Sequence, residues 1–136
     1  MQLTPYLLFS GHCEAAFTFY AECLGGTINA LLPYEGTPAA DHVSEEWRGK
    51  ILHACMSVGN QMLMGSDAPP DRFERVQGFS VSIMIEDPAE GERIFNALAE
   101  GGSVTMPYAQ TFWSYRFGMV TDRFDIPWMI NCDKAA

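Results

Sequence analysis

The chain has 136 residues, of which 48% are hydrophobic and 12% aromatic, and its formal net charge is −9. This length and composition are typical of one globular domain with a sizeable core, and they exclude a disordered or collagen-like chain. The excess of acidic residues repels phosphate backbones and anionic lipid, which argues against nucleic acid and membrane partners.

The sequence predicts a cytoplasmic protein. No apolar run approaches the roughly 20 residues that cross a bilayer, and residues 1–6 lack the cationic stretch of a secretory signal. The cysteines lie far apart in apolar segments, without a C-x-x-C pair, at Cys13, Cys23, Cys55 and Cys132. This spacing predicts free, buried thiols.

An internal duplication organises the predicted elements. Residues 7–28 align without a gap with residues 83–104, and the alignment matches Phe19 with Phe95 and the pair Gly25-Gly26 with Gly101-Gly102. Two copies of this length suggest a duplicated half-domain that closes one shared core. We therefore predict a single domain over residues 1–136, with similar halves at 1–70 and 78–136.

In the first half, a strand around residues 7–9 leads into a helix that ends at Gly25-Gly26. The buried stripe of this helix is predicted from helical spacing at Ala16, Phe17, Tyr20, Cys23 and Leu24. A strand then begins near Thr27, and strands at 51–58 and 61–65 form a hairpin around Gly59-Asn60. Residues 35–48 and 65–77 are predicted to be long loops.

The second half repeats this plan. Asp87, Pro88 and Glu90 have the spacing of a helix start in which both carboxylates satisfy free backbone amides. The helix buries Ile94, Phe95 and Leu98, and a strand near Ser103 and strands at 114–121 and 126–132 follow it. The predicted fold class is therefore α+β, with two tandem βαβββ modules that form curved mixed sheets.

Several segments carry a family resemblance. They are the start Pro5-Tyr6-Leu7, the run Met62-Leu63-Met64-Gly65-Ser66-Asp67, and residues 110–124 and 126–131. With the two βαβββ halves, they resemble a PhnB-like member of the glyoxalase/bleomycin-resistance/extradiol-dioxygenase superfamily, also called the vicinal oxygen chelate superfamily. PhnB-like chains are often labelled as similar to a demethylubiquinone methyltransferase. The resemblance implies half-barrels around a pocket, a small-molecule ligand and a homodimer.

The resemblance also implies where a metal would bind. Superfamily members that do chemistry hold a divalent metal with His and Glu side chains from the first and last strand of each half. The residues that match these positions are Pro5, Met64 (or Leu63), Ser80 or Val81, and Met129. None is a good ligand for a hard divalent cation. We therefore expect no catalytic metal, and no other cofactor, because nothing in the chain resembles a nucleotide-cofactor loop.

Two residues are candidate catalytic groups. His53 is predicted to share a strand face with Cys55 and Ser57, where it can act as a base or hydrogen-bond donor. The alternative is a histidine hydrogen-bonded to a neighbouring strand or loop. Asp67 can bind a cationic ligand or orient Arg116, and its alternative is to cap a loop, because Ser66-Asp67 precedes Ala68-Pro69-Pro70.

The candidate ligand-binding residues are mostly aromatic or thioether side chains, at Phe112, Trp113, Tyr115, Phe117, Met64, Met129 and Asn131. The aromatic cluster can stack on a flat ligand or enclose a cation, and core packing or a dimer contact is the alternative. Asn131 should face the same side as Met129, where a neighbouring strand or a ligand satisfies its amide. The methionines are predicted to fill the core or to line a plastic apolar pocket.

Three functions remain open on this basis. The first is a small-molecule-binding protein of the superfamily without the catalytic metal. The second is a metal-dependent or acid-base enzyme that acts on a small metabolite, with His53 or Asp67 as the acid-base group. The third is an antibiotic-sequestering protein of the bleomycin-resistance type.

Overall fold

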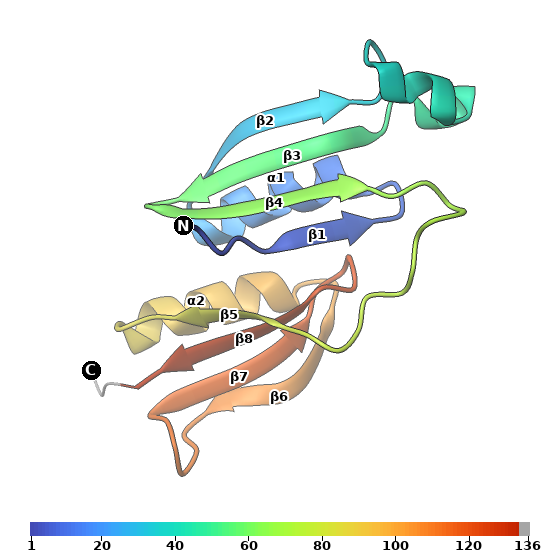
Figure 1. Ribbon diagram of the computed structural model, residues 1–136. Helices are drawn as coiled ribbons and strands as arrows, with labels where there is room; N and C mark the ends of the chain where they lie inside the picture. Colours follow the sequence, from blue (N-terminus) through green and yellow to red (C-terminus); the bar gives the residue numbers. More distant parts are fainter. Residues whose placement is uncertain (134–136) are drawn as a thin grey trace. The chain divides into compact units, whose positions relative to one another are not determined.

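The computed structural model describes residues 1–133, and the last residues of the predicted second half, 134–136, lie outside them. The chain divides into two compact units, Met1–Arg75 and Val76–Ala136. Each unit holds a four-stranded mixed sheet and one long helix (Figure 1). Both units therefore have the predicted βαβββ plan, and the single shared core stays a prediction.

The first unit contains β1 (Tyr6–Phe9), α1 (Cys13–Leu24), β2 (Thr27–Pro33), the 3₁₀ helices η1 (Pro38–His42) and η2 (Glu45–Trp47), β3 (Ile51–Val58) and β4 (Gln61–Asp67). The strand order is β1-β4-β3-β2, and only the β1–β4 pair is parallel. Two predictions need correction. The 35–48 segment contains two 3₁₀ helices, and β4 continues through Ser66 and Asp67, because both residues pair with β1.

The second unit contains β5 (Val81–Met84), α2 (Pro88–Ala99), β6 (Ser103–Ala109), β7 (Arg116–Thr121) and β8 (Pro127–Cys132). Its strand order, β5-β8-β7-β6, repeats that of the first unit, with β5 parallel to β8. β7 begins two residues later than predicted. The reason is that the backbone N–H of Ser114 donates to Oγ1 of Thr111, which holds Ser114 in the preceding turn.

The helix ends follow the local sequence. Gly25 and Gly101 adopt left-handed backbone with φ of 66° and 77°, where a side chain would be strained. The Asp87 carboxylate accepts from the backbone N–H of Ala89 at 3.0 Å, as predicted for a cap. Glu90 differs from the prediction, because its carboxylate pairs with Arg93 on the helix surface, and this pairing lowers the pKa of Glu90.

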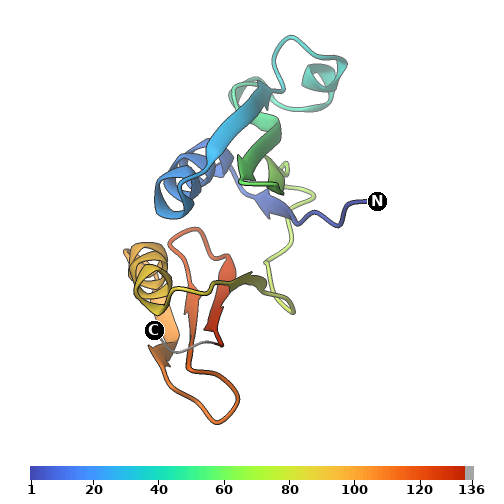
Figure 2. The same ribbon diagram turned by 90° about the vertical axis from the view of Figure 1, so that its left-hand side faces the viewer.

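Each helix packs on one face of its own sheet (Figure 2). Ala16, Phe17 and Tyr20 of α1 are fully buried, and so are Leu98 of α2 and Trp128 of β8. Further core residues from the sheets are Leu7, Phe9, Met56, Val120 and Ile130. The helices therefore cover the faces of the sheets that carry these residues.

The buried stripes correct one detail of the sequence duplication. The alignment matches Phe19 with Phe95, but Phe19 is only partly buried, and the fully buried phenylalanine of α1 is Phe17. All four cysteines are free and buried, as predicted. Within residues 1–133, neither long helix is apolar and extended enough to span a bilayer.

Gly65 of β4 allows α1 to approach its sheet closely. A Cβ atom at this position would lie 2.7 Å from the backbone oxygen of Leu7 and 2.9 Å from Cε1 of Phe17. We expect Gly65→Ala to lower the free energy of unfolding by about 1–3 kcal/mol, because the added methyl group overpacks the helix–sheet contact. Urea unfolding measures the change. Gly49→Ala is the control, because nothing lies within 4 Å of its Cβ position; equal stability of the two variants would contradict the prediction.

Candidate functional site

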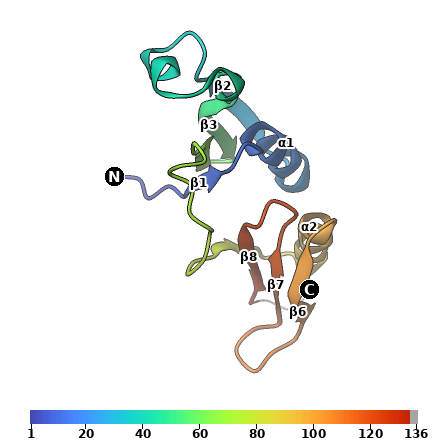
Figure 3. The ribbon, with the colours of Figure 1, turned by 90° about the vertical axis from the view of Figure 1, so that its right-hand side faces the viewer.

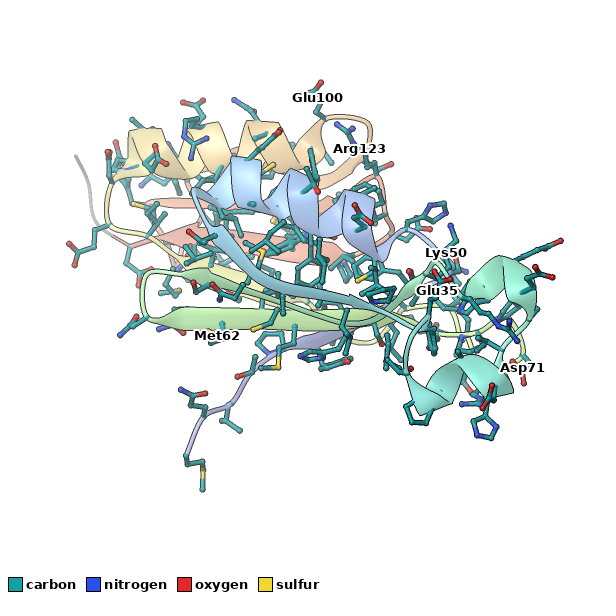
Figure 4. The ribbon with its side chains drawn as sticks, turned by 90° about the horizontal axis from the view of Figure 1, so that it is seen from above. Glu35, Lys50, Met62, Asp71, Glu100 and Arg123 are labelled. Carbon is teal, nitrogen blue, oxygen red and sulfur yellow. The ribbon has the colours of Figure 1, made fainter. Side chains whose placement is uncertain are left out.

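Within the first unit, α1 packs on one face of the sheet, and a different set of side chains forms the opposite face. Strand alternation and register place on this face the side chains of Tyr6, Leu8, His53, Cys55, Ser57, Met62, Met64 and Ser66. The opposite residues on β3 and β4, such as Ala54 and Leu63, are buried on the α1 side. Met62 lies on the side of β4 away from α1 in Figure 4. We call this set of eight residues the first open face.

His53 contacts Tyr6 on the first open face. The Tyr6 hydroxyl lies 3.1 Å from Nδ1 of His53, and the two rings stack with their centroids 5.8 Å apart. Tyr6 lies on β1 and His53 on β3, and β4 lies between these strands. The two side chains therefore meet over β4, near Met64. The register pairs Met64 with Tyr6 on one side and with Cys55 on the other. The structure therefore brings together His53, Tyr6, Met64 and Cys55.

Asp67 is also a candidate from the sequence, and its carboxylate is buried, with 1% of the residue exposed. Oδ1 accepts from the backbone N–H groups of Gly11 and Cys13, and Oδ2 accepts from that of Ile51, all at 2.9 Å. These contacts join the start of α1 to two strands. The arrangement favours the loop-capping alternative for Asp67 over a role in acid-base chemistry.

Two groups near Asp67 are held in their neutral form. Burial, and then the Asp67 carboxylate, raise the pKa of the Cys13 thiol far above its usual range. The same two causes raise the pKa of Tyr34, whose hydroxyl donates to the backbone oxygen of Asp67 at 2.8 Å. A neutral buried thiol is a poor nucleophile, so Cys13 is a packing residue.

The second sheet has an equivalent face away from α2. Its side chains include Ser82, Met84, Met106, Phe117, Met119, Met129 and Asn131, which we call the second open face. The register aligns Met106 with Met119 and Met119 with Met129, so three partly buried thioethers form one row across three strands. Met106 had no assigned role in the sequence analysis, because only the strand order places it beside the other two. The row provides a polarisable, adaptable surface.

Aromatic side chains adjoin this row. Trp113 packs edge-on against Phe117 with ring centroids 5.4 Å apart, and Phe112 packs against Trp113 at 4.7 Å. Figure 3 shows the loop between β6 and β7, which carries Phe112 and Trp113, projecting beyond the ends of these strands. Phe112 is almost fully exposed and Trp113 is half-exposed. The ring of Tyr115 packs against the guanidinium group of Arg116, whose Cζ lies 4.2 Å from the ring centroid.

Asn131 lies on the second open face with Met129, and protein groups satisfy its amide. Oδ1 accepts from the Ser114 hydroxyl at 2.5 Å, and Nδ2 donates to Oδ1 of Asp133 at 2.9 Å and to Sδ of Met84 at 3.2 Å. These contacts favour the first of the two predicted alternatives, in which the protein itself satisfies the amide.

Comparison with known proteins decides the family. A family model described as 3-demethylubiquinone-9 3-methyltransferase matches residues 1–131. The chain belongs to this family. Protein YjdN of Escherichia coli K12 is 34% identical over 98% of this chain and 97% of its own length. The crystal structure of protein PA1353 from Pseudomonas aeruginosa is 47% identical, covers 99% of both chains and has a TM-score of 0.90.

The 3-demethylubiquinone-9 3-methyltransferase family shares its fold with more distant proteins. A glyoxalase/bleomycin resistance protein/dioxygenase family enzyme from Burkholderia phytofirmans covers 96% of this chain and 97% of its own, with 10% identity and a TM-score of 0.66. This likeness confirms the predicted fold class.

The metal positions implied by the superfamily resemblance can be tested on the geometry. The backbone oxygen of Pro5 accepts from the N–H of Met64 at 3.1 Å, and the register aligns Val81 with Trp128 and Ser82 with Met129. The matched positions thus lie on or next to paired strands in each unit. None of their residues, Pro5, Met64 (or Leu63), Ser80 or Val81, and Met129, is a good ligand for a hard divalent cation. Among residues 1–133, no three His, Cys, Asp or Glu side chains gather to hold a metal ion.

Tyr6 is the residue at the site that the sequence analysis did not assign. The sequence indicated Tyr6 only weakly, because Tyr6 and Leu8 alternate with the buried residues Leu7 and Phe9 in the same short strand. Only the parallel pairing of β1 with β4 places Tyr6 within reach of His53.

Proposed function

We propose that this member of the 3-demethylubiquinone-9 3-methyltransferase family is a cytoplasmic, homodimeric small-molecule-binding protein that lacks the catalytic metal of its fold relatives. The observation that carries the proposal is the set of residues that the resemblance matches to the four metal ligands: Pro5, Met64 (or Leu63), Ser80 or Val81, and Met129. These side chains cannot replace His and Glu ligands, whereas the open faces offer thioether and aromatic side chains to an organic ligand.

Methyl transfer, which the family description names, receives no support from these residues. A methyl donor that carries a nucleoside needs a cradle, which in nucleotide-binding folds is a glycine-rich turn between a strand and a helix N-terminus. Here the paired glycines 25–26 and 101–102 follow the C-terminal ends of α1 and α2. The residues do not fit such a cofactor, and we derive no methyl-transfer step.

A second candidate function has one observation in its favour. The Tyr6–His53 hydrogen bond gives His53 a fixed partner, as acid-base groups in enzymes commonly have. No carboxylate or second histidine completes the pair among the described contacts of these two residues. Ligand binding therefore remains the function that the geometry supports best.

A thermal-shift screen tests the proposal with two classes of compound, divalent metal salts and small organic metabolites. A ligand at 100 times its dissociation constant stabilises a protein by about 2.7 kcal/mol, which raises the melting temperature by several degrees. We expect shifts with organic ligands and none with nickel, zinc, iron or manganese. Stabilisation by metals alone, or near-stoichiometric metal in the purified protein by elemental analysis, would overturn the proposal.

The aromatic loop provides a matched pair of variants. Trp113→Ala should weaken binding of an aromatic hit from the screen by about tenfold, because the indole ring contributes apolar area and stacking worth roughly 1–1.5 kcal/mol. Phe79→Ala removes an exposed aromatic ring outside both open faces and should leave affinity unchanged. Isothermal titration calorimetry measures both. Equal effects of the two substitutions would exclude Trp113 as a ligand-binding residue.

Sedimentation equilibrium tests the proposed homodimer and should return the mass of two chains. A monomer at micromolar concentration would contradict this part of the proposal without affecting ligand binding.

A further inference from the structure

The two open faces differ at one pair of equivalent positions. Met64 and Met129 occupy equivalent places, because they pair with Cys55 and Met119 and lie opposite Tyr6 and Ser82, respectively. His53 precedes Cys55 by two residues, as Phe117 precedes Met119. The tyrosine and histidine of the first unit therefore correspond to serine and phenylalanine in the second, and only the first open face holds the hydrogen-bonded pair.

The contact between Tyr6 and His53 has the geometry for donation from the phenol to the imidazole. A phenol is a good donor, and a neutral imidazole has one nitrogen that only accepts. The Tyr6 oxygen lies 3.1 Å from Nδ1, and donation from the hydroxyl to Nδ1 requires the proton of a neutral imidazole to be on Nε2. The stacked rings, with 28° between their planes, also restrict rotation of the imidazole. In this arrangement, His53 presents an N–H donor at its other edge.

The surroundings of the pair favour an acceptor as the bound group. The neighbouring side chains on the first open face are the thioether of Met64 and the thiol of Cys55, which are weak hydrogen-bonding groups. The Asp67 carboxylate lies on the α1 side of β4, where three backbone N–H groups donate to it, so it is not part of the first open face. Tyr6 is exposed and His53 is half-buried, so the pair is accessible to solvent.

We propose that His53, oriented by Tyr6, donates a hydrogen bond from Nε2–H to a ligand that lies on the first open face. The acceptor is an oxygen atom of a carbonyl or carboxylate group of this ligand. Tyr6 is the positioning residue and His53 the binding residue. The inference rests on the proposed function, and it adds the chemical class of the ligand and the unit of the chain that binds it. The apolar remainder of such a ligand contacts Met64 and Cys55.

The tautomer is measured on the wild-type protein without any ligand. Long-range ¹H–¹⁵N spectra of histidine-labelled protein, above the pH at which imidazole is protonated, distinguish Nε2–H from Nδ1–H. We expect the Nε2–H form for His53 and a mixture of tautomers in Tyr6→Phe. An Nδ1–H signal in the wild type would overturn the inference directly.

Binding is measured with three probes of similar size: benzoate, benzamide and benzylammonium. Benzoate and benzamide carry the acceptor and should perturb the signals of His53 and the Met64 methyl group, whereas the benzylammonium cation should not. His53→Phe introduces the residue type found at the equivalent position of the second unit, Phe117. It should weaken the binding of benzoate and of benzamide by about tenfold. His53→Gln keeps a donor near Nε2 and should restore part of the affinity. Tyr6→Phe should weaken binding by several-fold, and Ser82→Ala, its equivalent, should change nothing.

The outcomes separate this inference from the proposed function. If organic ligands stabilise the protein but His53→Phe binds benzoate as the wild type does, the inference fails and ligand binding stands. Failure of all three probes to bind, or preference for benzylammonium, also rejects the inference. The proposed function fails if no organic compound in the metabolite screen binds, or if the purified protein holds near-stoichiometric metal.

Discussion

Asp67→Ala should lower the free energy of unfolding by about 4 kcal/mol. The substitution leaves the backbone N–H groups of Gly11, Cys13 and Ile51 without this acceptor, and each buried group left unpaired costs roughly 1–3 kcal/mol. A domain of this size is stable by only about 5–15 kcal/mol, so the variant should be partly unfolded near physiological temperature. Urea unfolding followed by circular dichroism measures the difference.

Two further variants make the Asp67 test specific. Asp67→Asn keeps one oxygen acceptor but turns an NH₂ group toward one of the donors, so it should lose about half as much stability. Asp71→Ala removes an exposed carboxylate on the segment that follows β4 and should stay within about 0.5 kcal/mol of the wild type (Figure 4). If Asp67→Ala unfolds at the same urea concentration as Asp71→Ala, the structural role assigned to Asp67 is wrong.

Asp122→Ala should have a comparable effect on the second unit, about 3–5 kcal/mol. Asp122 is 2% exposed, and its carboxylate accepts from the backbone N–H groups of Phe124 and Ile126 and from Nε1 of Trp128 at 2.8 Å. Without it, the turn between β7 and β8 loses its acceptor and the fully buried Trp128 holds an unsatisfied indole N–H. The fluorescence of Trp128 should report the loosened packing, with a shift to longer wavelength in the folded variant.

Asp125, in the same turn, provides the control. It adopts left-handed backbone with φ of 70° and is exposed, so Asp125→Gly should be tolerated or slightly stabilising. Similar losses for the two aspartates would mean that the turn conformation, rather than the buried carboxylate of Asp122, supports this hairpin.

The local sequence predicted most of the fold because short-range physics determines it. Helical spacing identified Phe17 and Leu98 as buried, and Gly25 marked the end of α1 because only glycine adopts left-handed backbone without strain. Strand alternation placed His53 on the same face as Cys55 and Ser57, which the register bears out.

The sequence predicted less where a residue depends on a distant partner. It left Asp67 with two alternatives, because its donors at positions 11, 13 and 51 belong to other elements. Glu90 had the spacing of a capping residue, but Arg93, one turn further along the helix, binds its carboxylate. A nearby charge thus outcompeted the backbone amide.

By itself, the sequence determined the plan of two βαβββ modules, because this plan follows from residue identity and short-range spacing. The positions matched to metal ligands came from the family resemblance. The tertiary structure alone decided which residues meet: Tyr6 with His53 across β4, and Met106 with Met119 and Met129 in one row. The physical reason is that neighbours across a sheet are set by strand order and register. In this chain, the parallel pairs β1–β4 and β5–β8 join the two ends of each module.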